Sequence, residues 1–323
     1  MRGRFWLIGL CVWMVGCAPP RILTTPSPTQ TATKTEIVSP TATATGAPSS
    51  PAPPTLAPTT VPPTATPNVT FTATPETQPM EINTMLTITV LYDNVAHDAR
   101  LQTDWGFACL IEGLEQPLLF DTGGNGDILL RNMHALGVDP QTVRTVVLSH
   151  AHGDHTGGLA TFLAKNPDVA VYLPQSFPAN IKETVRRAGA AFVEVSEPTA
   201  IVIDAHTTGE LGSPIREQAL VLETPHGLVV ITGCAHPGIA VLVRQARATV
   251  AGDVYLVLGG FHLGEASAAQ IATTIAELRE LGVQHIAPSH CTGDAARRAF
   301  AEAFGQDYRE SGLGQIFVLG AEK

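Results

Sequence analysis

The chain has 323 residues, of which 44% are hydrophobic and 15% charged, and its formal net charge is −10 at pH 7. The first 80 residues hold four Lys or Arg and two Asp or Glu, which leaves 15 basic and 27 acidic residues, a net charge of −12, for the rest. Such an acidic domain excludes nucleic acid as an expected partner. Only the part after residue 80 has a composition able to build a hydrophobic core.

The N-terminus has the pattern of a secretory signal peptide, residues 1–17. Arg2 and Arg4 precede an apolar stretch, 5–15, that is too short to span a bilayer. Residues 14–17 resemble a bacterial lipobox, in which the chain is cut before the cysteine and acyl chains are attached to it; simple cleavage after Cys17-Ala18 is the alternative. We therefore expect an exported lipoprotein, held at the outer face of a bacterial membrane through Cys17 and touching the membrane through this anchor only.

Residues 18–80 are predicted to be a disordered linker. They contain fifteen of the 25 prolines, many threonines and almost no charged or large apolar residues. Such a segment buries too little surface to offset the entropy of ordering, and its prolines favour an extended, semi-rigid spacer. The remaining residues, 81–323, are expected to form one catalytic domain.

From residue 85 onwards, short runs rich in Val, Ile and Leu alternate with stretches of helical periodicity. The first half predicts strands at 86–91, 107–112, 117–120, 145–148 and 169–173, and helices at 128–136, 159–165 and 181–188. The second half predicts strands at 192–195, 200–203, 219–223, 228–231, 254–258, 284–287 and 316–319, and helices at 239–248, 268–281 and 295–304. Two similar halves of this kind predict an α/β (α+β) fold in which two mixed sheets pack face to face between helices, a four-layer αββα sandwich.

A cluster of metal-ligand side chains follows the predicted strand 145–148. The next residues read SHAHGDHTGG and contain His150, His152, Asp154 and His155. A buried strand would present these side chains at its carboxyl end, and imidazole together with carboxylate suits zinc, iron or manganese. Four ligand-type residues at these offsets indicate a metal site rather than a solvated histidine cluster.

This HxHxDH pattern resembles the signature of the metallo-β-lactamase superfamily. Further segments follow in the family's order: Asp121 in FDTGG, His236 in TGCAHPG and His290 in PSHCTG. The resemblance implies two divalent metal ions, with zinc favoured over iron or manganese, held by His150, His152 and His236 at site one and by Asp154, His155 and His290 at site two. It also implies that Asp121 bonds a ligand histidine or supports the metal loop, a turn-forming role being the alternative.

Each implied site has fewer ligands than a closed shell, as catalytic zinc does, so a metal-bound hydroxide is the expected nucleophile. One departure stands out. Many hydrolases of this family bridge both metals with an Asp after a later strand, but here the strand 254–258 runs into Gly259-Gly260-Phe261-His262. His262 could bind metal, protonate a leaving group or hydrogen-bond the substrate, an ordinary loop histidine being the alternative. Loss of an anionic bridge favours an anionic substrate.

The segments TGCAHPG, GGFHL and PSHCTG look most like one branch of the superfamily, which is related to the dihydropterin and aminobenzene phosphate synthase of methanopterin biosynthesis. The likeness covers residues 85–320. Three cysteines fall in this part. Cys109 is expected to be a small buried apolar side chain, whereas Cys234 and Cys291 stand beside candidate ligands and their role stays open.

The resemblance implies a hydrolase that cleaves an ester, phosphoester or related bond of a small anionic molecule. We expect Asp154 and His262 to be its catalytic side chains. A synthase-like transferase is the first alternative, although the export signal argues against it because phosphorylated biosynthetic intermediates belong in the cytosol. A noncatalytic, metal-dependent surface binder is the second. A true β-lactamase fits less well, because the GGFHL and PSHCTG segments resemble a different branch.

Overall fold

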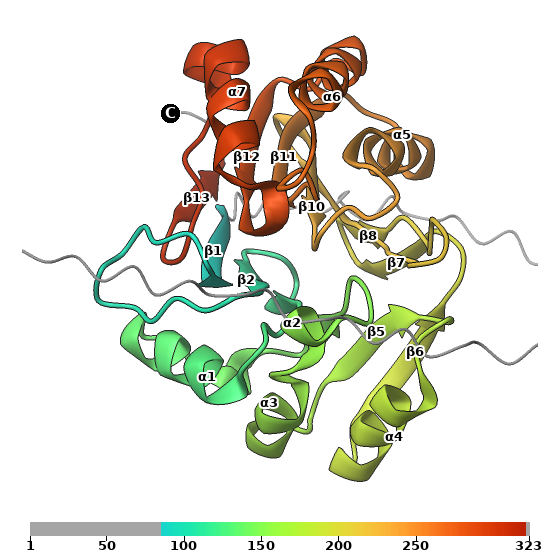
Figure 1. Ribbon diagram of the computed structural model, residues 1–323. Helices are drawn as coiled ribbons and strands as arrows, with labels where there is room; N and C mark the ends of the chain where they lie inside the picture. Colours follow the sequence, from blue (N-terminus) through green and yellow to red (C-terminus); the bar gives the residue numbers. More distant parts are fainter. Residues whose placement is uncertain (1–84, 321–323) are drawn as a thin grey trace, which may run out of the picture. The chain divides into compact units, whose positions relative to one another are not determined.

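The computed structural model describes residues 85–320, and these form the four-layer αββα sandwich that the sequence predicts (Figure 1). The predicted signal peptide (1–17), the linker (18–80) and the proposed lipidation of Cys17 lie outside the described residues. Within residues 85–320, no helix combines the length and hydropathy needed to cross a membrane.

The first sheet has seven strands in the order β13-β1-β2-β3-β4-β5-β6. The strands are β1 (Leu86–Asp93), β2 (Phe107–Glu112), β3 (Leu118–Phe120), β4 (Thr145–Val147), β5 (Ala170–Pro174), β6 (Ala191–Val195) and β13 (Ile316–Leu319). Its outer face is covered by the helices α1 (Gly126–Ala135), α3 (Leu159–Lys165) and α4 (Ala179–Ala188), in green at the bottom of Figure 1.

The second sheet has six strands in the order β12-β11-β10-β9-β8-β7. The strands are β7 (Thr199–Val202), β8 (Ala205–Thr207), β9 (Leu220–Thr224), β10 (Gly227–Thr232), β11 (Val254–Gly260) and β12 (His285–Ser289). The helices α5 (Ile239–Thr249), α6 (Ala268–Glu280) and α7 (Asp294–Phe304) cover its outer face, in orange and red at the top of Figure 1.

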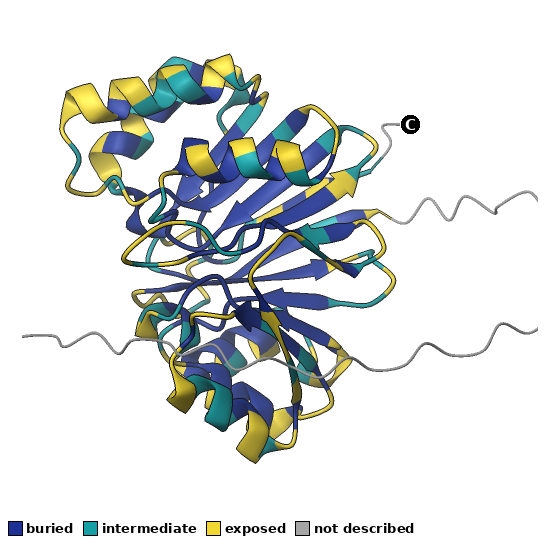
Figure 2. Ribbon diagram, turned by 90° about the vertical axis from the view of Figure 1, so that its right-hand side faces the viewer, coloured by how far each residue is buried: buried dark blue, intermediate teal, exposed yellow. Residues whose placement is uncertain are grey.

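Three apolar layers hold these elements together. One lies between the sheets and the other two lie between each sheet and its helices, so the central strands are buried on both faces (Figure 2). Strand β2 illustrates the pattern: Phe107, Cys109 and Ile111 face the layer between the sheets, whereas Ala108 and Leu110 face the helices. Because side chains alternate between faces, a strand between two cores reads as a continuous apolar run. Cys109 is a buried apolar residue, as predicted.

The direction of the strands determines where polar residues gather. In the first sheet β3, β4 and β5 are parallel, and in the second sheet β10, β11 and β12 are parallel. Ligands in α/β proteins bind beyond the carboxyl ends of parallel strands. The segments that begin at Asp121, Ser149, Gly233, Phe261 and His290 all leave such strand ends, so both sheets contribute side chains to one edge of the sandwich.

Two local differences from the expected elements are found. The strand β8 was not predicted, because its three residues are too few to show a periodicity. The residues after strand β4 were expected to form a loop that carries the metal motif. Instead, Gly153–Thr156 forms a short helix, α2, which places Asp154 and His155 on one turn.

Candidate metal centre

The metal motif is held against the loop that follows β3. The Thr122 N–H and hydroxyl both donate to the His155 carbonyl, and the Gly158 N–H donates to the Gly123 carbonyl. A Cβ at Gly157 would lie 2.2 Å from the Gly124 carbonyl oxygen, and one at Gly158 would lie 2.1 Å from the Thr122 carbonyl oxygen. Glycine at both positions therefore allows the two loops to approach closely enough for Asp121 to reach the motif.

The three residues predicted for site one lie together. The ring centroids of His150, His152 and His236 form a triangle with sides of 4.7 Å each. One donor atom from each ring lies within 4.8 Å of the other two. His150 is fully buried, His236 is partly buried and His152 is exposed. The structure thus brings histidines from the β4 and β10 strand ends into one group.

The three residues predicted for site two form a second, adjacent group. Asp154 Oδ2 lies 3.5 Å from His155 Nε2 and 3.3 Å from His290 Nε2. The two Nε2 atoms are 3.2 Å apart. The His150 and His155 ring centroids are 4.3 Å apart, so the two groups are neighbours.

Asp121 contacts residues that belong to both groups or support them. The N–H at His155 Nδ1 donates to Asp121 Oδ2 at 2.7 Å, which leaves Nε2 facing Asp154 and His290. The Ser149 hydroxyl donates to the same carboxylate oxygen at 2.7 Å and accepts from His150 Nδ1 at 2.9 Å, which leaves His150 Nε2 free for the first group. An outer partner that selects the tautomer in this way is a regular feature of metal-binding histidines.

His290 is oriented by Asn94, which lies 196 residues earlier in the chain. Its Nδ1–H donates to Asn94 Oδ1 at 2.8 Å, and the Asn94 amide donates to the His290 carbonyl at 3.3 Å. The ring of Trp105 packs against the His290 ring, with 4.9 Å between ring centroids. His290 has a φ of 49°, which non-glycine residues rarely adopt. These contacts hold its Nε2 toward Asp154.

A buried glutamate shapes the loop that carries His236. Glu217 is fully buried and its carboxylate accepts from the backbone N–H groups of residues 233, 234, 235 and 236 at 2.8–3.1 Å. Ala235 takes a left-handed φ of 60° within this loop. Four charge-assisted hydrogen bonds to one carboxylate make the loop rigid before any ligand binds. The sequence gives no signal for this role of Glu217.

The ionisation of the two groups suits cation binding. Burial, and then the neighbouring imidazoles, hold the pKa of His150 well below its usual range and lower that of His236 to about 4. For His155, burial is outweighed by Asp121 and Asp154, which raise its pKa to about 10. His150 and His236 are therefore neutral imidazoles at site one, while site two holds a carboxylate opposite a protonated imidazole whose proton a divalent ion would displace.

The donor chemistry fits the divalent ions that the family implies. Imidazole nitrogens and one carboxylate are the ligands that zinc and related ions take. His236 Nε2 is buried without a hydrogen-bond partner among the described residues, and His150 Nε2 faces His152 Nδ1 at 3.1 Å. Buried polar atoms left in this way need a partner, and a cation would supply it.

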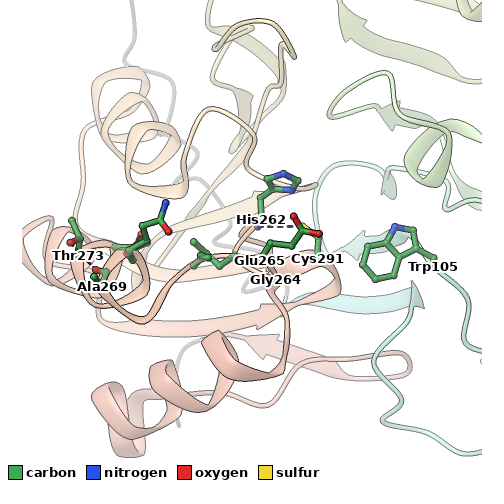
Figure 3. A pocket seen from close by; sticks show the side chains of 11 residues that line it. Trp105, His262, Gly264, Glu265, Ala269, Thr273 and Cys291 are labelled. Carbon is green, nitrogen blue, oxygen red and sulfur yellow. Dashed lines mark hydrogen bonds between the residues drawn. The ribbon is translucent and has the colours of Figure 1, made fainter. Parts of the chain in front are cut away.

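His262 lies beside the first group and faces a pocket. Its ring centroid is 4.2 Å from that of His236, and its φ is 52°. The hydrogen bond to Cys291 raises the pKa of His262. The pocket has a volume of about 840 Å³ and is lined by Trp105, His262, Glu265, Cys291 and residues of α6. In the view of Figure 3, His262 and Glu265 lie between Trp105 and Thr273.

A buried aspartate behind His290 yields a pH-dependent stability prediction. Burial raises the pKa of Asp93 to about 6, against an opposing hydrogen bond from the Val95 N–H. The unfolded pKa is about 3.9, so the folded protein is increasingly destabilised as pH rises from about 4 to 6, and the cost stays in full above pH 6. In metal-depleted protein, Asp93→Asn should raise the free energy of unfolding by up to about 3 kcal/mol at pH 8 and leave it unchanged near pH 3.5.

Urea unfolding of the Asp93→Asn variant and the parent at the two pH values measures this effect. The parent at each pH is the control, because every other titrating group is common to both proteins. An equal gain at both pH values would show that packing, and not the buried charge, limits stability at this position.

Comparison with known proteins identifies a matching family model and several similar proteins. The family model described as the metallo-beta-lactamase superfamily matches residues 106–281. The 7,8-dihydropterin-6-methyl-4-(beta-D-ribofuranosyl)-aminobenzene-5'-phosphate synthase of Methanocaldococcus jannaschii is 28% identical over 277 residues, which cover 71% of this chain and 94% of the relative. An uncharacterized protein of the same organism is 26% identical over 242 residues, 64% of this chain and 90% of the relative.

Solved structures agree with this placement. A crystal structure described as a metal-dependent hydrolase of the beta-lactamase superfamily has a TM-score of 0.62 and 28% identity, over 73% of this chain and 100% of that one. The metallo-beta-lactamase fold protein YhfI from Bacillus subtilis has a TM-score of 0.54 at 14% identity, over 72% of this chain and 99% of that one, and so supports the fold alone. With its fold, its histidine groups and a family model that covers more than half of its length, the chain belongs to the metallo-beta-lactamase superfamily.

Proposed function

We propose that the protein is a metal-dependent hydrolase that cleaves an ester, phosphoester or related bond of a small molecule. The observation that carries this proposal is the pair of adjacent donor groups, one of His150, His152 and His236 and one that includes Asp154, His155 and His290, at the carboxyl ends of the strands and beside a pocket of about 840 Å³. Two divalent ions held there would polarise the bond to be cleaved and lower the pKa of water to supply the nucleophile. The protein's own side chains would position the substrate and transfer protons.

His262 is placed to act on the substrate side. It lines the pocket, its ring is 4.2 Å from that of His236, and it belongs to neither of the two predicted ligand sets. A titratable imidazole at this position can hold a proton and pass it to a leaving group. Asp154 faces both His155 and His290 while keeping 21% of its side chain exposed, so it can hold an ion at site two and remain accessible to a substrate.

The residues that line the pocket restrict the class of substrate that we propose. Glu265 is acidic, Gln270, Thr273 and Thr274 are neutral hydrogen-bonding residues, and the lining residues include no Lys or Arg. An indole at Trp105 offers a flat apolar surface. A negative charge on the substrate therefore belongs at the metal end of the pocket, with a neutral and partly planar remainder toward α6.

A second candidate function is transfer rather than hydrolysis. It is favoured by the 28% identity to the M. jannaschii synthase over 94% of that protein's length. The predicted export signal favours hydrolysis, because a biosynthetic transferase of phosphorylated intermediates needs cytosolic substrates. Cell fractionation separates the two: protein in the membrane fraction, accessible to added protease in intact cells, supports the hydrolase, and protein inside the cytosol supports the transferase.

Metal analysis followed by a substrate panel tests the proposal directly. Purified full-length protein should retain about two equivalents of divalent metal and hydrolyse at least one generic ester or phosphodiester, as a two-metal site should. His152→Ala is the test variant, because this exposed side chain of the first donor group can be removed with little effect on the core. Equal turnover by the variant and the parent would support a noncatalytic binder, and a metal-free, inert parent would reject the proposal.

A further inference from the structure

Two buried thiols meet at the carboxyl edge of the second sheet. Cys234 follows β10 and Cys291 follows β12, and β11 lies between these two strands. Neighbouring strands are about 4.8 Å apart, so residues on either side of β11 would normally be separated by about twice that distance. The Sγ atoms of Cys234 and Cys291 nevertheless lie within 4.8 Å of each other. The segments that carry the two thiols therefore converge over the end of β11.

Gly260, the last residue of β11, makes this approach possible. A Cβ at Gly260 would lie 2.4 Å from the Gly233 carbonyl oxygen and 2.7 Å from Cys291 Sγ. Contacts of a Cβ below 3.0 Å are essentially never found, so any other residue would push the thiol away. The absence of a side chain thus leaves the space in which the Cys291 thiol reaches across β11 toward Cys234.

Hydrogen bonds orient the Cys291 side chain toward Cys234. The Cys291 S–H donates to the Cys234 carbonyl at 3.6 Å, and its Sγ accepts from the His262 N–H at 3.3 Å. Cys234 is held in turn by the buried Glu217 carboxylate, which accepts from its N–H at 2.9 Å. Both sulfurs are thus fixed on ordered backbone and close together, whereas Cys109 lies in the apolar layer between the sheets.

The Cys291 thiol can be reached from the pocket. Cys291 lines the pocket of about 840 Å³ and is 8% exposed, whereas Cys234 is 4% exposed and is not among the lining residues. A small two-electron oxidant such as hydrogen peroxide would therefore meet Cys291 first. An accessible thiol with a second thiol close behind it is the arrangement found in redox-sensitive cysteine pairs.

We propose that Cys234 and Cys291 form a reversible disulfide when the protein is free of metal and meets a peroxide. The Cys291 sulfur attacks one peroxide oxygen, the O–O bond breaks, and a sulfenic acid and one water form. The Cys234 sulfur then attacks the sulfenyl sulfur, an S–S bond replaces the S–O bond, and the hydroxide leaves with the thiol proton as a second water. Two thiols are oxidised, and one hydrogen peroxide is reduced to two waters.

The disulfide would oppose metal binding at site two. Cys234 Sγ lies 3.3 Å from His155 Nε2, which is one of the donor atoms of the second group. A bond to Cys291 would move this sulfur and its loop, and an ion bound at site two would hold them in place. This coupling to metal rests on the proposed two-metal function, whereas the disulfide itself does not. In the exported protein that the sequence predicts, the coupling matters because disulfides form and persist in oxidising compartments.

Peptide mapping by mass spectrometry tests the inference on the full-length protein. Metal-free, reduced protein is treated with equimolar hydrogen peroxide, the remaining thiols are alkylated, and the digest is analysed without a reductant. We expect a linked pair of peptides that contain Cys234 and Cys291, and a thiol reductant should separate them. The linked pair should be absent in Cys291→Ser and should persist in Cys109→Ser, the matched control, which removes a buried thiol outside the pair.

Zinc provides the second arm of the experiment. Zinc at about 100 times its dissociation constant leaves about one site in 100 empty, so the linked peptides should form about 100-fold more slowly in zinc-loaded protein. The oxidised protein should bind one equivalent of zinc less than the reduced protein, and reduction should restore it. Circular dichroism verifies that oxidation leaves the protein folded.

The outcomes separate this inference from the proposed function. Full alkylation of both cysteines after peroxide treatment, or their oxidation to separate sulfinic acids, would overturn the disulfide and leave the two-metal hydrolase standing. A linked pair that forms equally fast with and without zinc would overturn the coupling to site two. If reduced, zinc-loaded protein hydrolyses no substrate, the proposed function is rejected, while the linked peptides still establish the disulfide.

Discussion

Replacing Asp154 with alanine is expected to lower kcat/KM by at least about 100-fold and to reduce bound metal from about two equivalents to one. Asp154 is the only carboxylate among the six predicted ligands, and its Oδ2 faces both His155 Nε2 and His290 Nε2. Changes to outer partners of a metal site already cost about 10–100-fold, so the loss of a ligand should cost more. Site one, which consists of histidines alone, should keep its ion.

The measurement combines steady-state kinetics with elemental analysis of the same preparation. Glu115→Ala is a suitable control, because this carboxylate is exposed in the turn between β2 and β3 and makes no side-chain hydrogen bond among the described contacts. Both variants remove one negative charge, so a general electrostatic effect would appear in each. Full activity and two equivalents of metal in Asp154→Ala would reject the assignment of this residue.

Removing the metal ions is expected to lower the melting temperature by about 10–20 °C, and adding zinc back should restore it. A ligand present at about 100 times its dissociation constant stabilises the folded state by about 2.7 kcal/mol, and two sites give about twice that. In a domain of this size, 1 kcal/mol corresponds to about 2–4 °C. The ions would also relieve the close approach of imidazole nitrogens within each group, at 3.1 and 3.2 Å.

Differential scanning calorimetry with and without a chelator measures this shift, and elemental analysis verifies that the metal has been removed. The double variant His152→Ala, Asp154→Ala supplies the control, because it lacks one ligand from each group and its melting temperature should no longer respond to the chelator. An unchanged melting temperature in metal-free parent would mean that the donor groups are stable without ions.

The sequence alone predicted the αββα layers and four of the six proposed ligands, and the physical reason is that these signals are local. Strands buried on both faces leave continuous apolar runs, and the turns after them leave glycines and polar residues. His150, His152, Asp154 and His155 lie within six consecutive positions, so their spacing itself indicates a metal loop. His236 and His290 were reached through the family resemblance, and the structure brings both to the same edge.

Only the tertiary structure decided which residues orient these ligands, because the contacts join positions far apart in the chain. Asn94 and His290 are 196 residues apart, and Glu217 stands 16–19 residues before the four N–H groups that it binds. Neither the hydrophobic periodicity of the sequence nor the spacing of its residues indicates such long-range pairs. The same holds for Gly260. The sequence shows only that a carboxylate is absent there, whereas the structure shows that Gly233 and Cys291 leave no space for a side chain. The sequence therefore determined the kind of site, and the packing of distant segments decided that Cys234, rather than a carboxylate, lies beside its second group of ligands.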